Sequence, residues 1–155
     1  MNFGEKAVMF LATGFYVGNV PLAPGTLGSL IGLPLCFLLA GIQLPAAITL
    51  AMLFIGFAVW IANTAEKTLK QKDPGCIVID EVAGMVVTLI GLPLNLTTAG
   101  SGFIIFRILD ILKPFPIRTL DKRLTGGIGI VADDVVAGIF ANLFIRILLY
   151  ISDRF

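Results

Sequence analysis

The chain has 155 residues, of which 57% are hydrophobic and only 14% are charged, and its formal net charge is +1. Soluble domains usually carry about a quarter charged residues, so this composition excludes an ordinary water-soluble domain and indicates a bilayer as part of the solvent. The small net charge gives no reason to expect nucleic acid as a partner. The length predicts one domain over residues 1–155.

The chain contains no histidine and only two cysteines, Cys36 and Cys76. The absence of histidine excludes nucleophilic pairs of the Ser–His and Cys–His kind. It also leaves too few nitrogen and sulfur ligands for a zinc site. The remaining candidates for metal ligands are oxygen atoms, including those of ten Asp and Glu side chains, and these suit magnesium.

Apolar segments separated by turns predict an all-α fold: a small polytopic membrane bundle of four to five hydrophobic helices behind a short N-terminal helix. A helix needs about 20 apolar residues to cross a bilayer, so the fourth and fifth segments are either thin, tilted spans or half-buried helices. The expected segments, in chain order, are 5–20, 27–44, 46–63, 74–94, 103–114 and 132–151.

The connections between these segments differ in charge. Eight of the eleven Lys and Arg residues lie at 67–72 and 107–123, whereas the turns at 41–45 and 95–102 carry none. The positive-inside rule places the basic stretches in the cytoplasm and the uncharged turns outside.

Charged side chains recur where the expected helices meet the cytoplasmic boundary. They are Asp80 and Glu81 at the start of one segment, Arg107, Asp110 and Lys113 at the end of the next, and Asp133 and Asp134 at the start of the last. Ions within lipid cost at least a few kcal/mol, so such groups lie at the boundary or face polar partners. We expect them to converge on one metal and one phosphate. Alternatively, the acidic pairs only complement helix dipoles, and Arg107 pairs with Asp110.

Two glycine-rich stretches, PGTLGS at 24–29 and GGIGI at 126–130, precede expected helices. Thr26 or Ser29 is expected to cap the helix that follows the first stretch. The starts of helices expose backbone N–H groups to anions, so Thr26, Ser29 and the residues around Ala132 are candidate donors to a phosphate. Neither stretch contains the Gly-Lys-Ser/Thr of a nucleotide-binding loop, so nucleotide binding is not predicted.

Four blocks of the sequence resemble the signature blocks of the phosphatidylglycerophosphatase A family. They are GNVPLAPGTLGSL (18–30), KDPGCIVIDEVAG (72–84), FRILDILKPFPI (106–117) and GGIGIVADDVVAG (126–138). Val131 stands where the family pattern has methionine, which exchanges one apolar side chain for another. The resemblance implies a magnesium-dependent bacterial membrane enzyme that dephosphorylates the phospholipid phosphatidylglycerophosphate to phosphatidylglycerol and phosphate. With the charge pattern, it predicts a multi-pass protein of the inner (cytoplasmic) membrane whose active site faces the cytoplasm.

The roles of the carboxylates in this reaction are predicted from the ligands that magnesium prefers. Magnesium keeps several waters, so two or three carboxylates suffice to bind it. The predicted ligands are Glu81, Asp133 and Asp134, with Asp80 as a further ligand or as the general base. Asp110 is expected to orient an arginine or to complete the metal shell. Which carboxylate acts as base, nucleophile or direct ligand is left open.

The cations are assigned to the phosphate. Arg107 and Lys113 are expected to clamp its oxygens, and Arg118 is expected to assist them. Hydroxyl or N–H groups of Thr26 and Ser29 complete the predicted phosphate site.

A small ion-coupled transporter or channel is the alternative from another functional class. Its intramembrane carboxylates would lie near the midplane, on broken helices. Here the charges cluster at one boundary, which favours the phosphatase. The sequence leaves the oligomeric state and the number of metal ions open.

Overall fold

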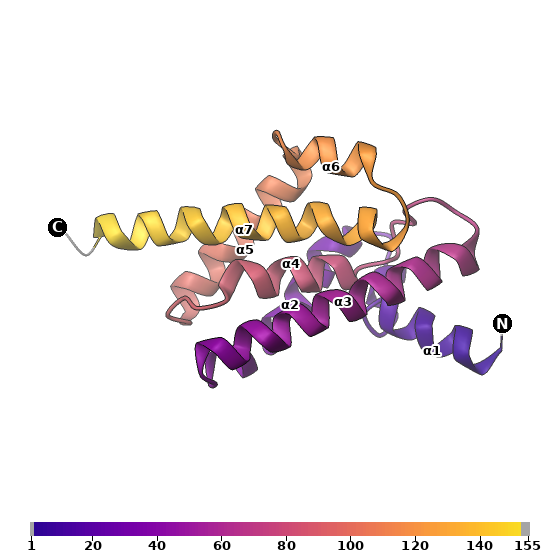
Figure 1. Cartoon of the computed structure of the whole chain (residues 1–155), viewed down its shortest axis with the longest axis horizontal. Helices are drawn as coiled ribbons and strands as arrows, with labels where there is room; N and C mark the ends of the chain where they lie inside the picture. Colours follow the sequence, from indigo (N-terminus) through magenta and orange to yellow (C-terminus); the bar gives the residue numbers. More distant parts are fainter. Residues whose placement is uncertain (1, 153–155) are drawn as a thin grey trace.

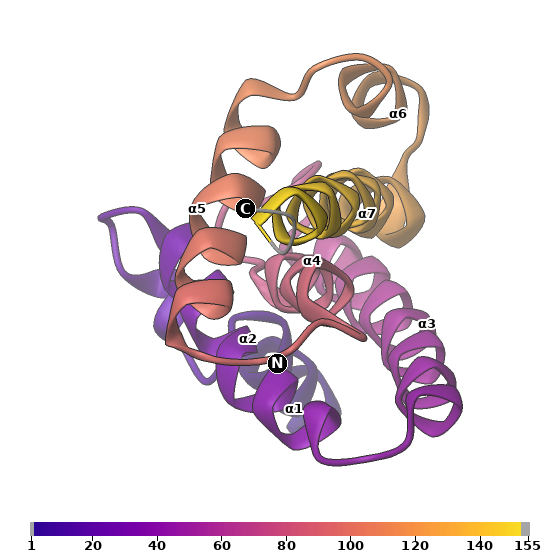
Figure 2. The same ribbon diagram turned by 90° about the vertical axis from the view of Figure 1, so that its left-hand side faces the viewer.

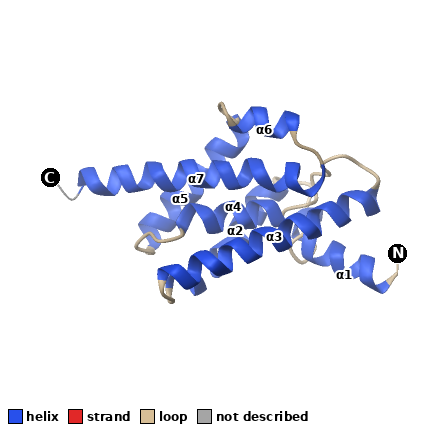
Figure 3. Cartoon of the chain, in the orientation of Figure 1, coloured by secondary structure: helices blue, strands red, loops and turns tan. Residues whose placement is uncertain are grey.

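A computed structural model describes residues 2–152, and within this range every element of secondary structure is a helix (Figure 3). The helices are α1 (Phe3–Ala12), α2 (Pro24–Ala40), α3 (Leu44–Leu69), α4 (Ile79–Leu89), α5 (Leu96–Leu112), α6 (Ile117–Arg123) and α7 (Gly126–Ser152), with a 3-10 turn, η1, at Val17–Asn19. The predicted all-α class is confirmed.

Helix α4 lies at the centre of the bundle (Figures 1 and 2). Helices α2, α3, α5 and α7 all pack against it, α1 packs on α3, and α6 packs on α7. Most of the α4 side chains are buried, including Met85 and Val86. A helix that is apolar on nearly every side is stable only when other elements cover it, which explains the central position of this short segment.

Helices α4 and α7 run in the same direction and touch through glycines. A Cβ atom on Gly138 would lie 2.5 Å from the carbonyl oxygen of Gly84, and one on Gly84 would lie 2.5 Å from the ring of Phe106. Small residues at such contacts let two helix backbones approach closely. Asp80 and Asp134 each precede one of these glycines by four residues, so the packing brings the two acids to the same level.

The C-terminal end of α4 is held by side chains of α7. Asn142 Nδ2 donates to the carbonyl oxygens of Thr88 and Ile90 at 2.9 and 3.0 Å. Arg146 Nη2 donates to those of Ile90 and Gly91 at 3.2 and 3.1 Å. The last carbonyl groups of a helix have no partner within it, so these bonds cap α4.

Among the helices of residues 2–152, two, α3 and α7, are long and apolar enough to cross a membrane, whereas four to five were expected. Helix α3 continues six residues beyond the expected span of 46–63, while α2 and α5 have 17 residues each and α4 only 11. In the most apolar 18-residue segment of α3, only 22% is buried inside the fold, and in that of α7 only 28%. Both helices therefore present many apolar side chains outward. Examples are Leu53, Trp60, Phe144 and Ile147.

The first two expected boundaries are wrong. The helix expected over 5–20 ends at residue 12, and Phe15 has a φ of 59°, which a right-handed helix does not contain. The N-cap of α2 is Ala23, so Thr26 and Ser29 lie inside that helix and neither caps it.

Later boundaries also differ from expectation. The uncharged stretch 95–102 is largely helical, because Asn95 caps α5 by accepting a hydrogen bond from the Thr98 N–H at 2.9 Å. No helix was expected between residues 114 and 132, but this stretch contains α6, and α7 starts at Gly126 rather than at 132.

The glycine-rich start of α7 is helical because its glycines fit against neighbouring backbone. A Cβ atom on Gly127 would lie 2.7 Å from the backbone nitrogen of Asn63, and one on Gly129 would lie 2.7 Å from the carbonyl oxygen of Leu124. The glycines therefore serve close packing. Ala132 lies in the second turn of α7, where N–H groups bond within the helix, so the expected anion site at a helix start there is wrong.

Candidate active site

A cavity of about 320 Å³ lies where the N-terminal turns of α2 and α4 meet the C-terminal end of α5 and the second and third turns of α7. Ten side chains were predicted for the site, and seven of them line this cavity. They are Asp80, Glu81, Arg107, Asp110, Lys113, Asp133 and Asp134. Residues far apart in the sequence are therefore brought to one place by the packing of four helices.

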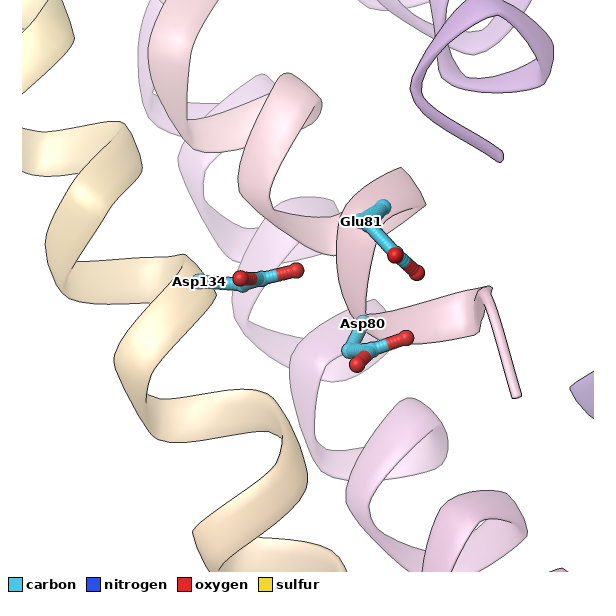
Figure 4. Close-up of side chains that lie close together, drawn as sticks. All are labelled: Asp80, Glu81 and Asp134. Atoms are coloured by element: carbon cyan, nitrogen blue, oxygen red, sulfur yellow. The ribbon is translucent and has the colours of Figure 1, made fainter. Parts of the chain in front are cut away.

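Three of the carboxylates form a compact cluster (Figure 4). Asp80 and Glu81 lie in the first turn of α4, and Asp134 extends from α7 toward them. One carboxylate oxygen from each lies within 4.8 Å of the other two. Each of the three side chains also has a buried oxygen that accepts no hydrogen bond from any residue in the range 2–152. Buried acceptors without donors are costly, and a divalent cation would satisfy all three, so the cluster fits magnesium.

Burial has a direct effect on the acids of α4. It raises the pKa of Asp80 well above its ordinary value, and the neighbouring charges of Glu81 and Asp134 raise it further. Burial also raises the pKa of Glu81, with the positive charge of Arg107 acting in the opposite direction. Without a cation, the cluster therefore retains protons at pH values where isolated carboxylates are ionised.

Arg107 is oriented by two neighbours. Its Nη1 donates to Asp110 Oδ2, one turn further along α5, and to Ser29 Oγ at 3.5 Å. Ser29 Oγ in turn donates to the carbonyl oxygen of Gly25 at 2.8 Å. The Nε of Arg107 is buried and has no acceptor in the described part of the chain. The guanidinium is thus fixed in place with a donor left over for an anion, and Ser29 supports it.

Lys113 is held by two carboxylates. Its Nζ donates to Asp133 Oδ2 in α7 and to Asp121 Oδ1 in α6 at 2.9 Å. Burial alone would lower the pKa of Lys113, but the hydrogen bonds and charges of these two acids outweigh it and raise the pKa above its ordinary value. Lys113 is therefore cationic, and Asp133, predicted as a metal ligand, lies against this lysine and outside the three-carboxylate cluster.

Three predicted phosphate-binding residues do not line the cavity: Thr26, Ser29 and Arg118. Ser29 reaches it only through Arg107. Thr26 lies in the first turn of α2, and Arg118 lines a separate cavity beside α6.

Sequence reasoning missed Gly25, which does line the cavity. A Cβ atom at this position would overlap the Glu81 carboxylate and lie 3.1 Å from Arg107 Nη1. The glycine lets the first turn of α2 close one side of the site. The pairing of Asp80 with Asp134 had an overlooked sequence signal, the repeated pattern Asp-x-Val-Ala-Gly at 80–84 and 134–138.

Comparison with known proteins gives consistent matches over most of the chain. A family model described as Phosphatidylglycerophosphatase A matches residues 10–149. Phosphatidylglycerophosphatase A of Escherichia coli (strain K12) is 42% identical over 132 residues, which cover 84% of this chain and 77% of that protein. Phosphatidylglycerophosphatase A of Haemophilus influenzae is 37% identical over 147 residues, covering 92% and 89%.

A third relative carries a different name. A putative phosphatidylinositol-3-phosphatase of Bacteroides thetaiotaomicron is 35% identical over 149 residues, which cover 90% of this chain and 91% of that protein. No solved structure matches the chain.

Proposed function

Because the chain belongs to the phosphatidylglycerophosphatase A family, it is a phosphatase that converts phosphatidylglycerophosphate to phosphatidylglycerol and phosphate, and we propose that the carboxylate-lined cavity is its active site. One observation carries this proposal. Asp80, Glu81 and Asp134 come together from two helices with buried, unpartnered oxygens, beside Arg107 and Lys113.

The three clustered acids would hold a magnesium ion. Their oxygens are hard ligands, and three carboxylates leave positions for water and for a phosphate oxygen. When bound, the ion would polarise the phosphoryl group and make a bound water more acidic.

The cations would bind the terminal phosphate of the substrate. A phosphomonoester is a dianion near neutral pH, and charge-assisted hydrogen bonds from Arg107 and Lys113 suit it. Asp110 orients the guanidinium, and Asp133 orients the ammonium group. Each cation therefore has its own carboxylate, which keeps it from pairing with the acids that hold the metal.

We place the protein in the bacterial inner membrane, with α3 and α7 crossing the bilayer and the cavity facing the cytoplasm. The outward apolar side chains of these two helices support this placement, because large exposed apolar surfaces mark contact with lipid or protein. The uncharged turns that follow α2 and α4 lie toward one end of the molecule, and the basic α3–α4 connection lies toward the other (Figure 1). By the positive-inside rule, the basic end is cytoplasmic. The acyl chains of the substrate would remain in the bilayer.

The test is phosphate release from phosphatidylglycerophosphate in detergent micelles, with magnesium or with EDTA. We expect Asp134→Asn to lower kcat/KM at least about 100-fold, because one ligand of the ion is weakened. Glu5→Gln is the matched control: it makes the same acid-to-amide change in α1, outside the cavity, and should retain activity. Wild-type activity in EDTA would refute the metal, and an active Asp134→Asn would refute the site.

A further inference from the structure

A second cavity, of about 510 Å³, lies beside the proposed active site. It is formed by the C-terminal end of α5, the connection that follows it, and α6. The described residues that line it include no acid and four cations, namely Lys113, Arg118, Lys122 and Arg123. Within residues 2–152, the last three of these cations have no carboxylate partner. We call this the basic cavity.

The basic cavity and the carboxylate cavity share Lys113, which lines both. Lys113 also links α6 to α7, because its Nζ donates hydrogen bonds to Asp121 of α6 and to Asp133 of α7. Two sites for anions therefore lie side by side, with one cation between them.

The basic cavity also has an apolar rim. Leu112 and Phe115 line it, and they are 71% and 84% exposed. Exposed apolar side chains next to unpaired cations are suited to the boundary of a bilayer, where anionic headgroups meet acyl chains. The chemistry of this cavity thus matches the part of a phospholipid where a phosphodiester adjoins diacylglycerol.

We propose that the basic cavity binds the phosphodiester of the lipid substrate while the terminal phosphate occupies the carboxylate cavity. This rests on the proposed function for the position of the reacting phosphate. Phosphatidylglycerophosphate carries both groups, joined by glycerol, and the phosphodiester is the one nearer the acyl chains. Lys113 would lie between the two phosphates. Arg118 and Lys122 would therefore select lipids that have a phosphodiester in addition to the phosphomonoester.

The test compares two lipids. Phosphatidylglycerophosphate has both groups, whereas phosphatidic acid has only a phosphomonoester. The double variant Arg118→Gln/Lys122→Gln should lower kcat/KM for phosphatidylglycerophosphate about tenfold, mainly through KM, because a binding contact remote from the reacting phosphate is removed. The same variant should change kcat/KM for phosphatidic acid less than about twofold. Lys67→Gln/Lys70→Gln removes two exposed charges outside the basic cavity and serves as the matched control.

A binding measurement separates this proposal from the proposed function. Short-chain phosphatidylglycerol contains the phosphodiester alone, and the double variant should bind it about tenfold more weakly than the wild type or the control. If the wild type released no phosphate, the proposed function would fail, and this binding measurement would still decide on the basic cavity. Equal losses on both lipids would mean general attraction to anionic surfaces and would overturn the proposal. Unchanged kinetics and binding would overturn it as well.

Discussion

Asp133 and Asp134 are adjacent in the sequence, yet they meet different partners. Successive residues of an α-helix point about 100° apart, so only one of the two can face α4. Asp134 joins Asp80 and Glu81, while Asp133 accepts a hydrogen bond from Lys113. The residue types alone predicted that both acids belong to the site. Their separate roles depend on which side of α7 packs against α4, and this is set by the contact at Gly138.

Gly25 offers a residue-scale prediction. Gly25→Ala places a methyl group that overlaps the Glu81 carboxylate and lies 3.1 Å from Arg107 Nη1. The displaced carboxylate should lower kcat/KM for phosphate release at least about tenfold. The fold should persist, because alanine favours a helix over glycine by about 1 kcal/mol. Gly56→Ala is the matched control in α3, where a Cβ atom would meet nothing within 4 Å. Full activity of Gly25→Ala would show that the first turn of α2 does not shape the site.

At the scale of elements, the hydrophobic pattern predicted six of the seven α-helices of residues 2–152 in their correct order, and it missed α6. It failed where glycine or polar composition suggested a turn. Residues 126–131 contain three glycines and resemble a loop, but contacts with α3 and the preceding loop make them helical. Residues 97–102 are all small or polar, yet the cap at Asn95 starts α5 just before them. Both helix starts depend on tertiary packing or on a capping side chain, and hydrophobic periodicity does not detect either of them.

The capping of α4 by α7 gives a prediction about stability. Asn142→Ala removes the donor to the carbonyl oxygens of Val87, Thr88 and Ile90. The Ile90 carbonyl keeps its hydrogen bond from Arg146, whereas those of Val87 and Thr88 lose the side-chain donor that caps them. We expect a loss of about 2 kcal/mol in the free energy of unfolding, which should lower the midpoint of thermal unfolding in detergent by several degrees. Gln43→Ala, whose side chain makes no capping bond, is the control. A midpoint equal to that of the control would mean that these carbonyl groups are satisfied in another way.

On the scale of the whole molecule, the site exists because the chain assembles acids from α4 and α7 in a core that offers them few donors. The sequence predicted that charged residues gather on one side, because their order along the chain and the basic loops indicate it. It did not predict that α4 is a central buried helix. Four helices surround α4 and exclude water from Asp80 and Glu81. A bound cation would therefore stabilise the ionised carboxylates of the cluster.

This desolvation makes stability depend on pH in a direction that can be measured. The pKa values of Asp80 and Glu81 are raised in the folded, metal-free protein, so the folded state binds more protons than the unfolded state once the pH exceeds the ordinary values. The stabilising contribution of these protons is present at acidic pH and is lost as the pH rises through the raised values. In EDTA, these two groups should therefore make thermal unfolding begin at a lower temperature at about pH 8 than at about pH 5.

Magnesium should oppose the loss of thermal stability at higher pH, because it binds only the ionised carboxylates. The rise in the unfolding midpoint on adding magnesium should be larger at about pH 8 than at about pH 5, where protons compete with the ion. In Glu81→Gln one titrating ligand is absent, so both the decline in EDTA and the magnesium-dependent rise should shrink. A magnesium effect of the same size at both pH values would mean that the ion binds elsewhere, since only a site made of these protonated acids couples the two equilibria.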